Sequence, residues 1–147
     1  MPADDLLGRL AQELAEYSTV VVRSYWEGRG LWICPKKVGG FDVGIDVDGQ
    51  YLTITSPVYD ERFSDRRLAL KYALSLLTSE TRLMRVTRGD ELVCREIQYR
   101  RGFRWTTGTR VSGAFMPFWK KKHVEVFQND ALSKPQTELI CSNVLDS

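Results

Sequence analysis

In residues 41–48, four apolar side chains alternate with three aspartates and Gly44, and this alternation most strongly constrains the fold. A period of two is typical of a strand that is buried on one face and solvated on the other. Gly49-Gln50 follows, and a glycine at the first position of a two-residue loop favours a tight β-hairpin. This loop brings apolar residues of the two strands together in pairs, Val47 with Leu52 and Ile45 with Ile54. The sequence therefore predicts an antiparallel sheet with one buried face.

Two segments carry apolar residues at helical spacing. Leucines lie three and four positions apart within residues 4–17, so they form one stripe on a helix. A second stripe through Leu70, Leu74 and Leu77 follows Ser64, a residue type that favours helix N-caps. Both helices are expected to pack on one face of the sheet.

The length and composition are those of one globular domain. The chain has 147 residues, of which 43% are hydrophobic, and a chain of this length buries about 70% of its unfolded surface. It therefore needs neither a metal nor a disulfide to fold. We predict a single domain over residues 1–147 with an α+β fold. The expected order is α-ββββ-α-βββ, with room for one more strand, giving about seven or eight antiparallel strands in one or two sheets.

Residues 91–100 and 103–112 predict a second hairpin, whose loop contains Gly102. A two-residue loop at 101–102 places Tyr99 opposite a charged residue, Arg104. A three-residue loop at 100–102 instead pairs apolar residues with each other, so we expect the longer loop. In that register Tyr99 and Trp105 lie in the core. The opposite face carries polar residues, namely Gln98, Arg104 and Arg110.

The net charge of +2 conceals an uneven distribution along the chain. Residues 1–61 have a net charge of −5, residues 62–122 of +10, and residues 123–147 of −3. A basic segment of this kind can suit an anionic partner, but arginines and lysines on solvated strand faces are the more ordinary explanation. Candidate partner-binding residues for an acidic protein, or for nucleic acid, are the arginines of the second hairpin, Arg100, Arg101, Arg104 and Arg110.

Three aspartates, Asp42, Asp46 and Asp48, share one face of the first predicted strand. The Asp-Val-Asp-Gly run at 46–49 lacks the third acidic position and the closing glutamate of a calcium loop. An extended strand also separates Asp42 from Asp46 by roughly 13 Å. We therefore predict no metal site here, and we interpret the three aspartates as candidate contacts for a basic partner.

Trp32 is a candidate aromatic contact on the same face as these aspartates. If Ile33 pairs with Val43, Trp32 lies opposite Gly44 and points away from the core. The hypothesis depends on that register.

The residues that could carry out catalysis are few and far apart. Cys34, Cys94 and Cys141 form no Cys-x-x-Cys pair, and their odd number and wide spacing favour reduced thiols in a cytoplasmic protein. His123 is the only histidine, and nothing in the sequence brings it beside a cysteine. We expect no catalytic residues, no cofactor and no enzymatic activity. The acidic start of the chain and the lack of a long apolar run predict neither a signal peptide nor a membrane span.

The tryptophan, glycine and tyrosine pattern of residues 4–85 resembles small cytoplasmic immunity proteins of bacterial polymorphic toxins, including those paired with NAD-hydrolysing necrotising toxins. The resemblance lies in Trp26, Gly30-Leu31-Trp32, residues 41–47, residues 51–55, the helical run 67–74, and Arg82. It implies a protein that inhibits a toxin by occluding its active site, and it assigns no binding residue. The leading hypothesis is thus a non-enzymatic protein-binding module. The alternative is a nucleic-acid-binding domain that uses the basic region 62–122.

Overall fold

The computed structural model describes residues 3–113 and 117–146, which form an α+β fold of three helices and two antiparallel sheets. The elements are, in order, α1 (Ala3–Leu14), β1 (Val20–Tyr25), a 3₁₀ turn η1 (Trp26–Gly28), β2 (Gly30–Pro35), β3 (Val43–Asp48), β4 (Tyr51–Thr55), β5 (Asp60–Phe63), α2 (Arg66–Ser75), β6 (Thr81–Arg88), β7 (Glu91–Arg101), β8 (Arg104–Ser112), β9 (Lys122–Gln128) and α3 (Lys134–Leu145). Sheet A has the strand order β1-β2-β3-β4-β5, and sheet B has the order β8-β7-β6-β9.

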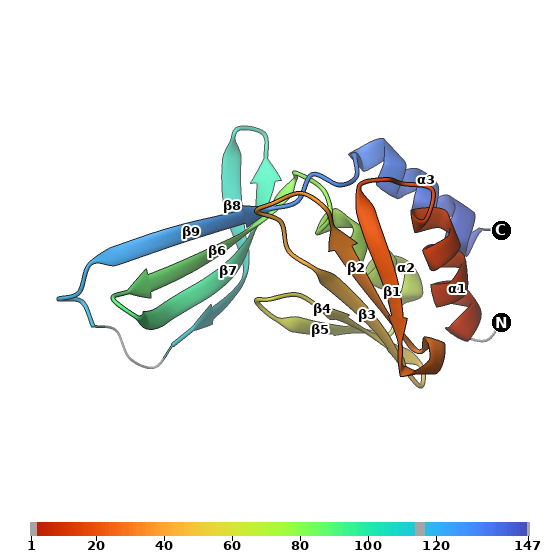
Figure 1. The fold of residues 1–147 in the computed structure, drawn as a ribbon, viewed down its shortest axis with the longest axis horizontal. Coiled ribbons are helices and arrows are strands. Elements are labelled where there is room, and N and C mark those ends of the chain that lie inside the picture. Colours follow the sequence, from red (N-terminus) through yellow and green to blue (C-terminus); the bar gives the residue numbers. More distant parts are fainter. Residues whose placement is uncertain (1–2, 114–116, 147) are drawn as a thin grey trace.

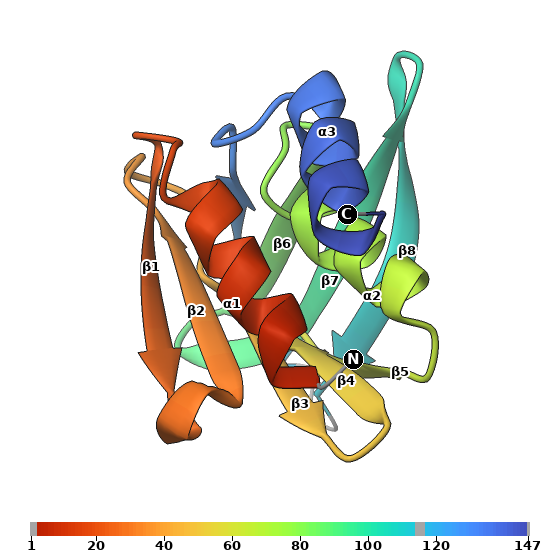
Figure 2. The ribbon, with the colours of Figure 1, turned by 90° about the vertical axis from the view of Figure 1, so that its right-hand side faces the viewer.

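The three helices cover one face of sheet A, and sheet B projects beyond the other face (Figures 1 and 2). α1 contacts β1 and β2, whereas α2 contacts β3, β4 and β5. The expectation that both predicted helices pack on one sheet face is therefore correct. α3 lies against α1 and α2 and completes the helical layer.

The first hairpin has the register that the alternation predicted. Val47 pairs with Leu52 and Ile45 pairs with Ile54, while Gly49 has the positive φ of 61° that its loop position requires. The apolar residues of β3 and β4 face the helices, where Ile45, Ile54 and the α1 leucines are buried. Burial of this one face fixes the register, because a slip by one residue would expose the whole apolar set.

The chain has more elements than the sequence predicted, namely nine strands and three helices among the described residues. β5 was missed because three of its four residues are charged, so it lacks the apolar alternation of a half-buried strand. α3 was not predicted, because only Ile140, Cys141 and Val144 form its buried face, too narrow a stripe to indicate a helix from sequence. The second helix also begins one residue later than expected: Asp65, and not Ser64, accepts hydrogen bonds from the backbone N–H groups of Arg67 and Leu68.

The predicted loop of the second hairpin is wrong. Arg101 pairs with Arg104, so the loop contains two residues, Gly102 and Phe103, and Gly102 has a φ of 61°. Gly89 has a φ of 59° in the loop between Arg88 and Glu91. All three two-residue hairpin loops thus place glycine first, and the rule that gave the first hairpin applies to the other two.

The observed register moves Trp105 away from its expected position. Trp105 pairs with Arg100, whereas Tyr99 pairs with Thr106, so the two aromatic side chains lie on opposite faces of sheet B. Tyr99 packs against the main core, but Trp105 does not. Gln98 lies on the same face of sheet B as Trp105, and Arg104 lies on the opposite face. A register shift in the β7–β8 ladder, between Glu96 and Gln98, also brings Arg110 onto the face of Trp105.

The main core joins both sheets and all three helices. Sheet B contributes Leu83 and Ile97 to this core, with Phe127 packed against it, so the base of sheet B is attached to the rest of the molecule. Farther out, sheet B has a separate small cluster of Val86, Val93 and Cys94. Sheet B is thus joined to sheet A at one end, and its outer part forms a projecting wing (Figure 1).

Candidate functional site

The face of sheet A that lies away from the helices carries Trp32 and the three predicted aspartates. We call it the open face. The strand registers place on it alternate residues of each strand, namely Val21, Arg23, Tyr25, Trp32, Cys34, Asp46, Asp48, Tyr51, Thr53, Thr55, Asp60 and Arg62. Asp42, just before β3, lies beside Cys34 and Trp32 at the end of this face. Four carboxylates therefore share this face with two arginines, and one of these, Arg62, pairs with Asp48 at 3.8 Å. As predicted, Asp42, Asp46 and Asp48 lie on one side of their strand.

Trp32 lies near the middle of the open face, over a glycine. Ile33 pairs with Val43 and Trp32 pairs with Gly44, so the predicted register is confirmed. A Cβ at position 44 would lie 3.0 Å from the Trp32 ring, which shows how closely the indole covers the glycine backbone. The ring of Tyr25 lies 5.8 Å from that of Trp32 and covers Gly30 in the same way. These aromatic-glycine pairs hold flat aromatic surfaces against the sheet.

Asp46 is in an unfavourable position for a charged group. Its Oδ1 is buried and has no hydrogen-bond partner among the described residues. Burial and the nearby Asp60 carboxylate raise the pKa of Asp46 above its ordinary value. The open face therefore holds a carboxylate, Asp46, with no cation paired to it among the residues that the structure describes. A basic group of a bound partner would stabilise the ionised form of this carboxylate.

Replacing Asp46 with asparagine is expected to stabilise the fold at neutral pH. Because the folded-state pKa of Asp46 is raised, ionisation of Asp46 lowers stability as the pH rises through that pKa. The gain at pH 7 should stay below about 1 kcal/mol, since solvent screens a partly exposed side chain. It should vanish below about pH 3.9, where aspartate is protonated in both states. Urea denaturation of both proteins at pH 3 and pH 7 measures the difference; an equal effect at the two pH values would contradict this assignment.

A cleft of about 660 Å³ lies where the open face meets sheet B. Trp32 and Asp42 line it from sheet A, and Arg85 and Arg95 line it from sheet B. Arg95 is fixed by a hydrogen bond of 2.7 Å from its Nη1 to the carbonyl of Pro57. The cleft thus brings together carboxylate, aromatic and guanidinium groups from segments far apart in the sequence.

The four predicted arginines do not form one cluster. Arg100 and Arg110 share a face of sheet B with Trp105, whereas Arg101 and Arg104 pair on the opposite face near the hairpin tip. Nη2 of Arg110 lies 3.8 Å from the sulfur of Cys94. The Arg110 side chain therefore lies over the small cluster of Val86, Val93 and Cys94. The basic segment of the sequence therefore spreads over both sides of sheet B.

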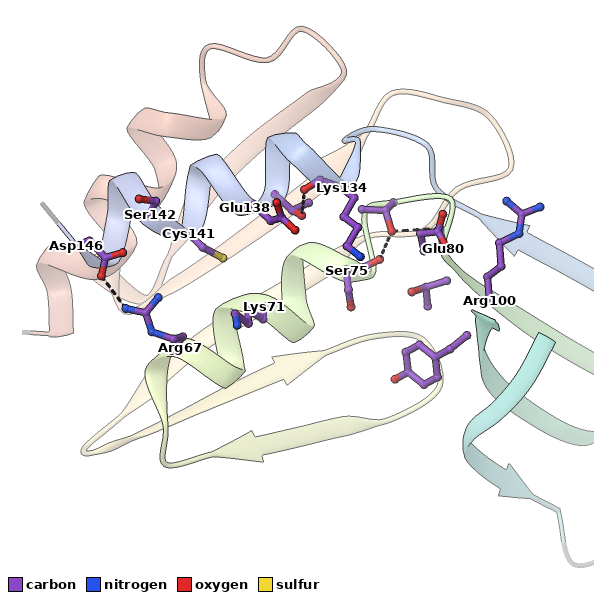
Figure 3. Close-up of a pocket in the computed structure, with 14 residues that line it drawn as sticks. Arg67, Lys71, Ser75, Glu80, Arg100, Lys134, Glu138, Cys141, Ser142 and Asp146 are labelled. Atoms are coloured by element: carbon purple, nitrogen blue, oxygen red, sulfur yellow. Dashed lines mark hydrogen bonds and ion pairs between the residues drawn. The ribbon is translucent and has the colours of Figure 1, made fainter. Parts of the chain in front are cut away.

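A second cavity, of about 530 Å³, lies in the groove between α2 and α3 (Figure 3). In Figure 3, the Lys134 side chain of α3 extends across the groove toward Ser75 of α2, whose hydroxyl donates to the carbonyl of Tyr72 at 2.7 Å. Arg67 and Asp146 close its far end through a hydrogen-bonded ion pair of 2.7 Å. The groove carries charges of both signs along its length, so its electrostatics favour no single class of ligand.

The sequence reasoning missed this groove because it missed α3. A signal for that helix is present: Ser133 and Gln136 form a reciprocal capping box, and Pro135 lies within the first turn. Ile140, Cys141 and Val144 then provide the buried face.

The thiols and the histidine lie apart. Cys34 is on the open face, where burial and the Asp42 carboxylate raise the pKa of its thiol. Cys94 and His123 lie on opposite faces of sheet B, and Cys141 is on α3. Within the described residues, no group of three or more histidine, cysteine, aspartate or glutamate side chains is placed to hold a metal ion.

Comparison with protein-family models, curated proteins and solved structures found no match to this chain. In the part of the chain that the structure describes, no helix is both long enough and apolar enough to cross a membrane.

Proposed function

We propose that the protein is a non-enzymatic binding module that holds a basic protein surface on the open face of sheet A. We further propose that this partner is a bacterial toxin whose active site the module occludes. The observation that carries the proposal is the position of Trp32, a half-buried aromatic ring that lines the cleft together with Asp42 and lies on the same face as Asp46. The toxin partner is supported by the resemblance of residues 4–85 to immunity proteins, since this range contains every strand of sheet A.

The open face combines the two kinds of group that binding surfaces use. A rigid aromatic side chain gives a large contact area with little loss of conformational freedom, which is why tryptophan and tyrosine recur as binding hot spots. Carboxylates without a paired cation attract a basic partner and speed its capture. The sheet holds both in fixed positions, because each residue is set by the registers of neighbouring strands.

Substitutions on the open face should weaken toxin binding. The assay is co-expression and titration with the product of an adjacent toxin gene, comparing the wild type with Trp32→Ala and Asp42→Lys. Loss of a central aromatic contact is expected to weaken binding about 30-fold, equivalent to about 2 kcal/mol. Phe103→Ala is a matched control, because Phe103 is fully exposed at the β7–β8 hairpin tip. The proposal fails if no adjacent toxin is bound and neutralised, or if only the control variant weakens binding.

A second candidate function, nucleic-acid binding by sheet B, is favoured by one specific observation. The guanidinium of Arg82 lies 4.1 Å from the centre of the Trp105 ring, and that of Arg100 lies 5.5 Å from it. An aromatic ring among arginines can stack on a base while the arginines contact phosphates. The test is titration of single-stranded RNA at increasing salt, with Trp105→Ala as the variant. Binding should weaken steeply with salt; no binding at low salt would eliminate this candidate.

A further inference from the structure

β9 forms an outer edge of sheet B and has no strand beside it on one side among the described residues. It pairs with β6 over seven consecutive residue pairs without a register shift. Such an edge presents unpaired backbone N–H and C=O groups to any strand that can align with it. Of the other three edges, β5 has four residues, and the β7–β8 ladder contains a register shift. β1 is regular over six residue pairs, but its one charged residue is Arg23, so two copies of β1 offer no pair of opposite charges.

β9 carries two exposed valines among the polar side chains of Lys122, His123, Glu125 and Gln128. Val124 is 40% exposed and Val126 is 50% exposed, and both lie on the same face of sheet B as the half-buried Met84. Edge strands that avoid pairing carry charges at such positions. The valines therefore favour a neighbour that extends the sheet.

We propose that β9 pairs antiparallel with β9 of a second copy of this chain, about a twofold axis at Val124. In this register Val124 faces its own counterpart, and His123 faces the partner's Glu125 twice. An imidazole N–H can donate to a carboxylate in either protonation state of histidine, so both cross-strand pairs are favourable. The result is a continuous eight-stranded sheet formed by two copies of sheet B.

Charge decides between this register and its neighbour. A twofold axis at Glu125 would place the two Glu125 carboxylates directly opposite each other, which is destabilising. With the axis at Val124, Lys122 instead faces the partner's Val126. The lysine runs of the two copies, residues 120–122, then lie at opposite ends of the joint and do not repel each other.

The experiment measures mass in solution by sedimentation equilibrium, up to roughly 0.1 mM protein. The wild type should associate to twice the chain mass of 16.9 kDa. Val124→Lys places two lysines at the twofold axis and should weaken the dimer at least about tenfold. Val21→Lys is the matched control, because Val21 is 41% exposed on the β1 edge of sheet A and should leave the dimer intact. A monomeric wild type, or equal effects of the two substitutions, overturns the proposal.

A charge exchange tests the register itself. His123→Glu places a glutamate opposite the partner's Glu125 twice and should dissociate the dimer. Adding Glu125→His to that variant restores a histidine-glutamate pair at both positions and should restore association. If the double variant stays as weak as the single one, the register is wrong. Unchanged thermal unfolding of the monomeric variants shows that the substitutions act on association and not on folding. The mass measurement uses this protein alone, so its result does not depend on toxin or nucleic-acid binding.

Discussion

Replacing Asn129 with alanine is expected to lower the free energy of unfolding by about 4 kcal/mol. Asn129 is fully buried, and its side chain makes three hydrogen bonds to backbone groups. Oδ1 accepts from the N–H of Phe41 at 2.9 Å, while Nδ2 donates to the carbonyls of Phe41 at 3.0 Å and Leu76 at 2.9 Å. The amide thus joins the segment after β9 to the segment before β3 and to the end of α2. Alanine leaves all three backbone groups buried and unpaired, which explains the size of the cost.

Urea denaturation of the wild type and Asn129→Ala gives the difference in stability directly. Asn143→Ala is the matched control: Asn143 is exposed, and its one side-chain bond, to Glu13 at 3.1 Å, lies on the surface. That substitution should change stability by less than about 0.5 kcal/mol. A loss below about 1 kcal/mol for Asn129→Ala would show that water or local movement satisfies the three backbone groups.

Replacing Gly44 with valine is expected to cost about 2–3 kcal/mol and to displace Trp32 from the open face. A Cβ at this position meets the Trp32 ring at 3.0 Å and the Cβ of Thr55 at 3.2 Å, before any further methyl groups are added. The added atoms cannot enter the core, because residue 44 points away from the helices. The indole must therefore rotate outward, and toxin binding on the open face should weaken with it.

Three measurements check this prediction: denaturation, tryptophan fluorescence and toxin titration. Gly44→Ala should show a smaller loss of stability, of about 1 kcal/mol. The double variant Trp32→Ala/Gly44→Val should recover part of the loss, because removing the ring makes room for the valine. If the two changes are instead additive in stability, Trp32 and Gly44 are not coupled in the way the contact implies. Gly8→Ala is a control for added volume, since an added Cβ there has no neighbour within 4 Å; because Gly8 lies inside α1, this variant should gain about 0.5–1 kcal/mol of stability.

The parts of the fold that the sequence predicted well are those with a strong local signal. The alternation in residues 41–48 and the loop at Gly49 determined a complete register, and the Trp32–Gly44 pair followed from it. The second hairpin failed because the loop was chosen by matching apolar residues across strands. In sheet B apolar and charged residues share both faces, so this criterion misled, whereas the glycine rule alone would have given Gly102-Phe103.

The remaining errors come from elements whose stability depends on contacts with distant residues. β5 is a strand because β4 provides its hydrogen-bond partners and α2 covers Phe63 and its neighbours, although its own residues are mostly charged. α3 has a clear capping box at its start, but few apolar residues along its length. These residues are buried only because α1 and α2 pack against them. Secondary structure of this kind is set by packing more than by local preference.

The sequence by itself determined the α+β class, the register of the first hairpin and the shared face of Trp32 and the three aspartates. These follow from side-chain periodicity, which acts between near neighbours along the chain. Only the tertiary structure decided that the basic segment divides between the two faces of sheet B, that Arg85 and Arg95 meet Trp32 in a cleft, and that β9 is left as an open edge. Those features depend on how two sheets and three helices pack around one core, and on buried bonds such as those of Asn129 that link residues up to 88 positions apart.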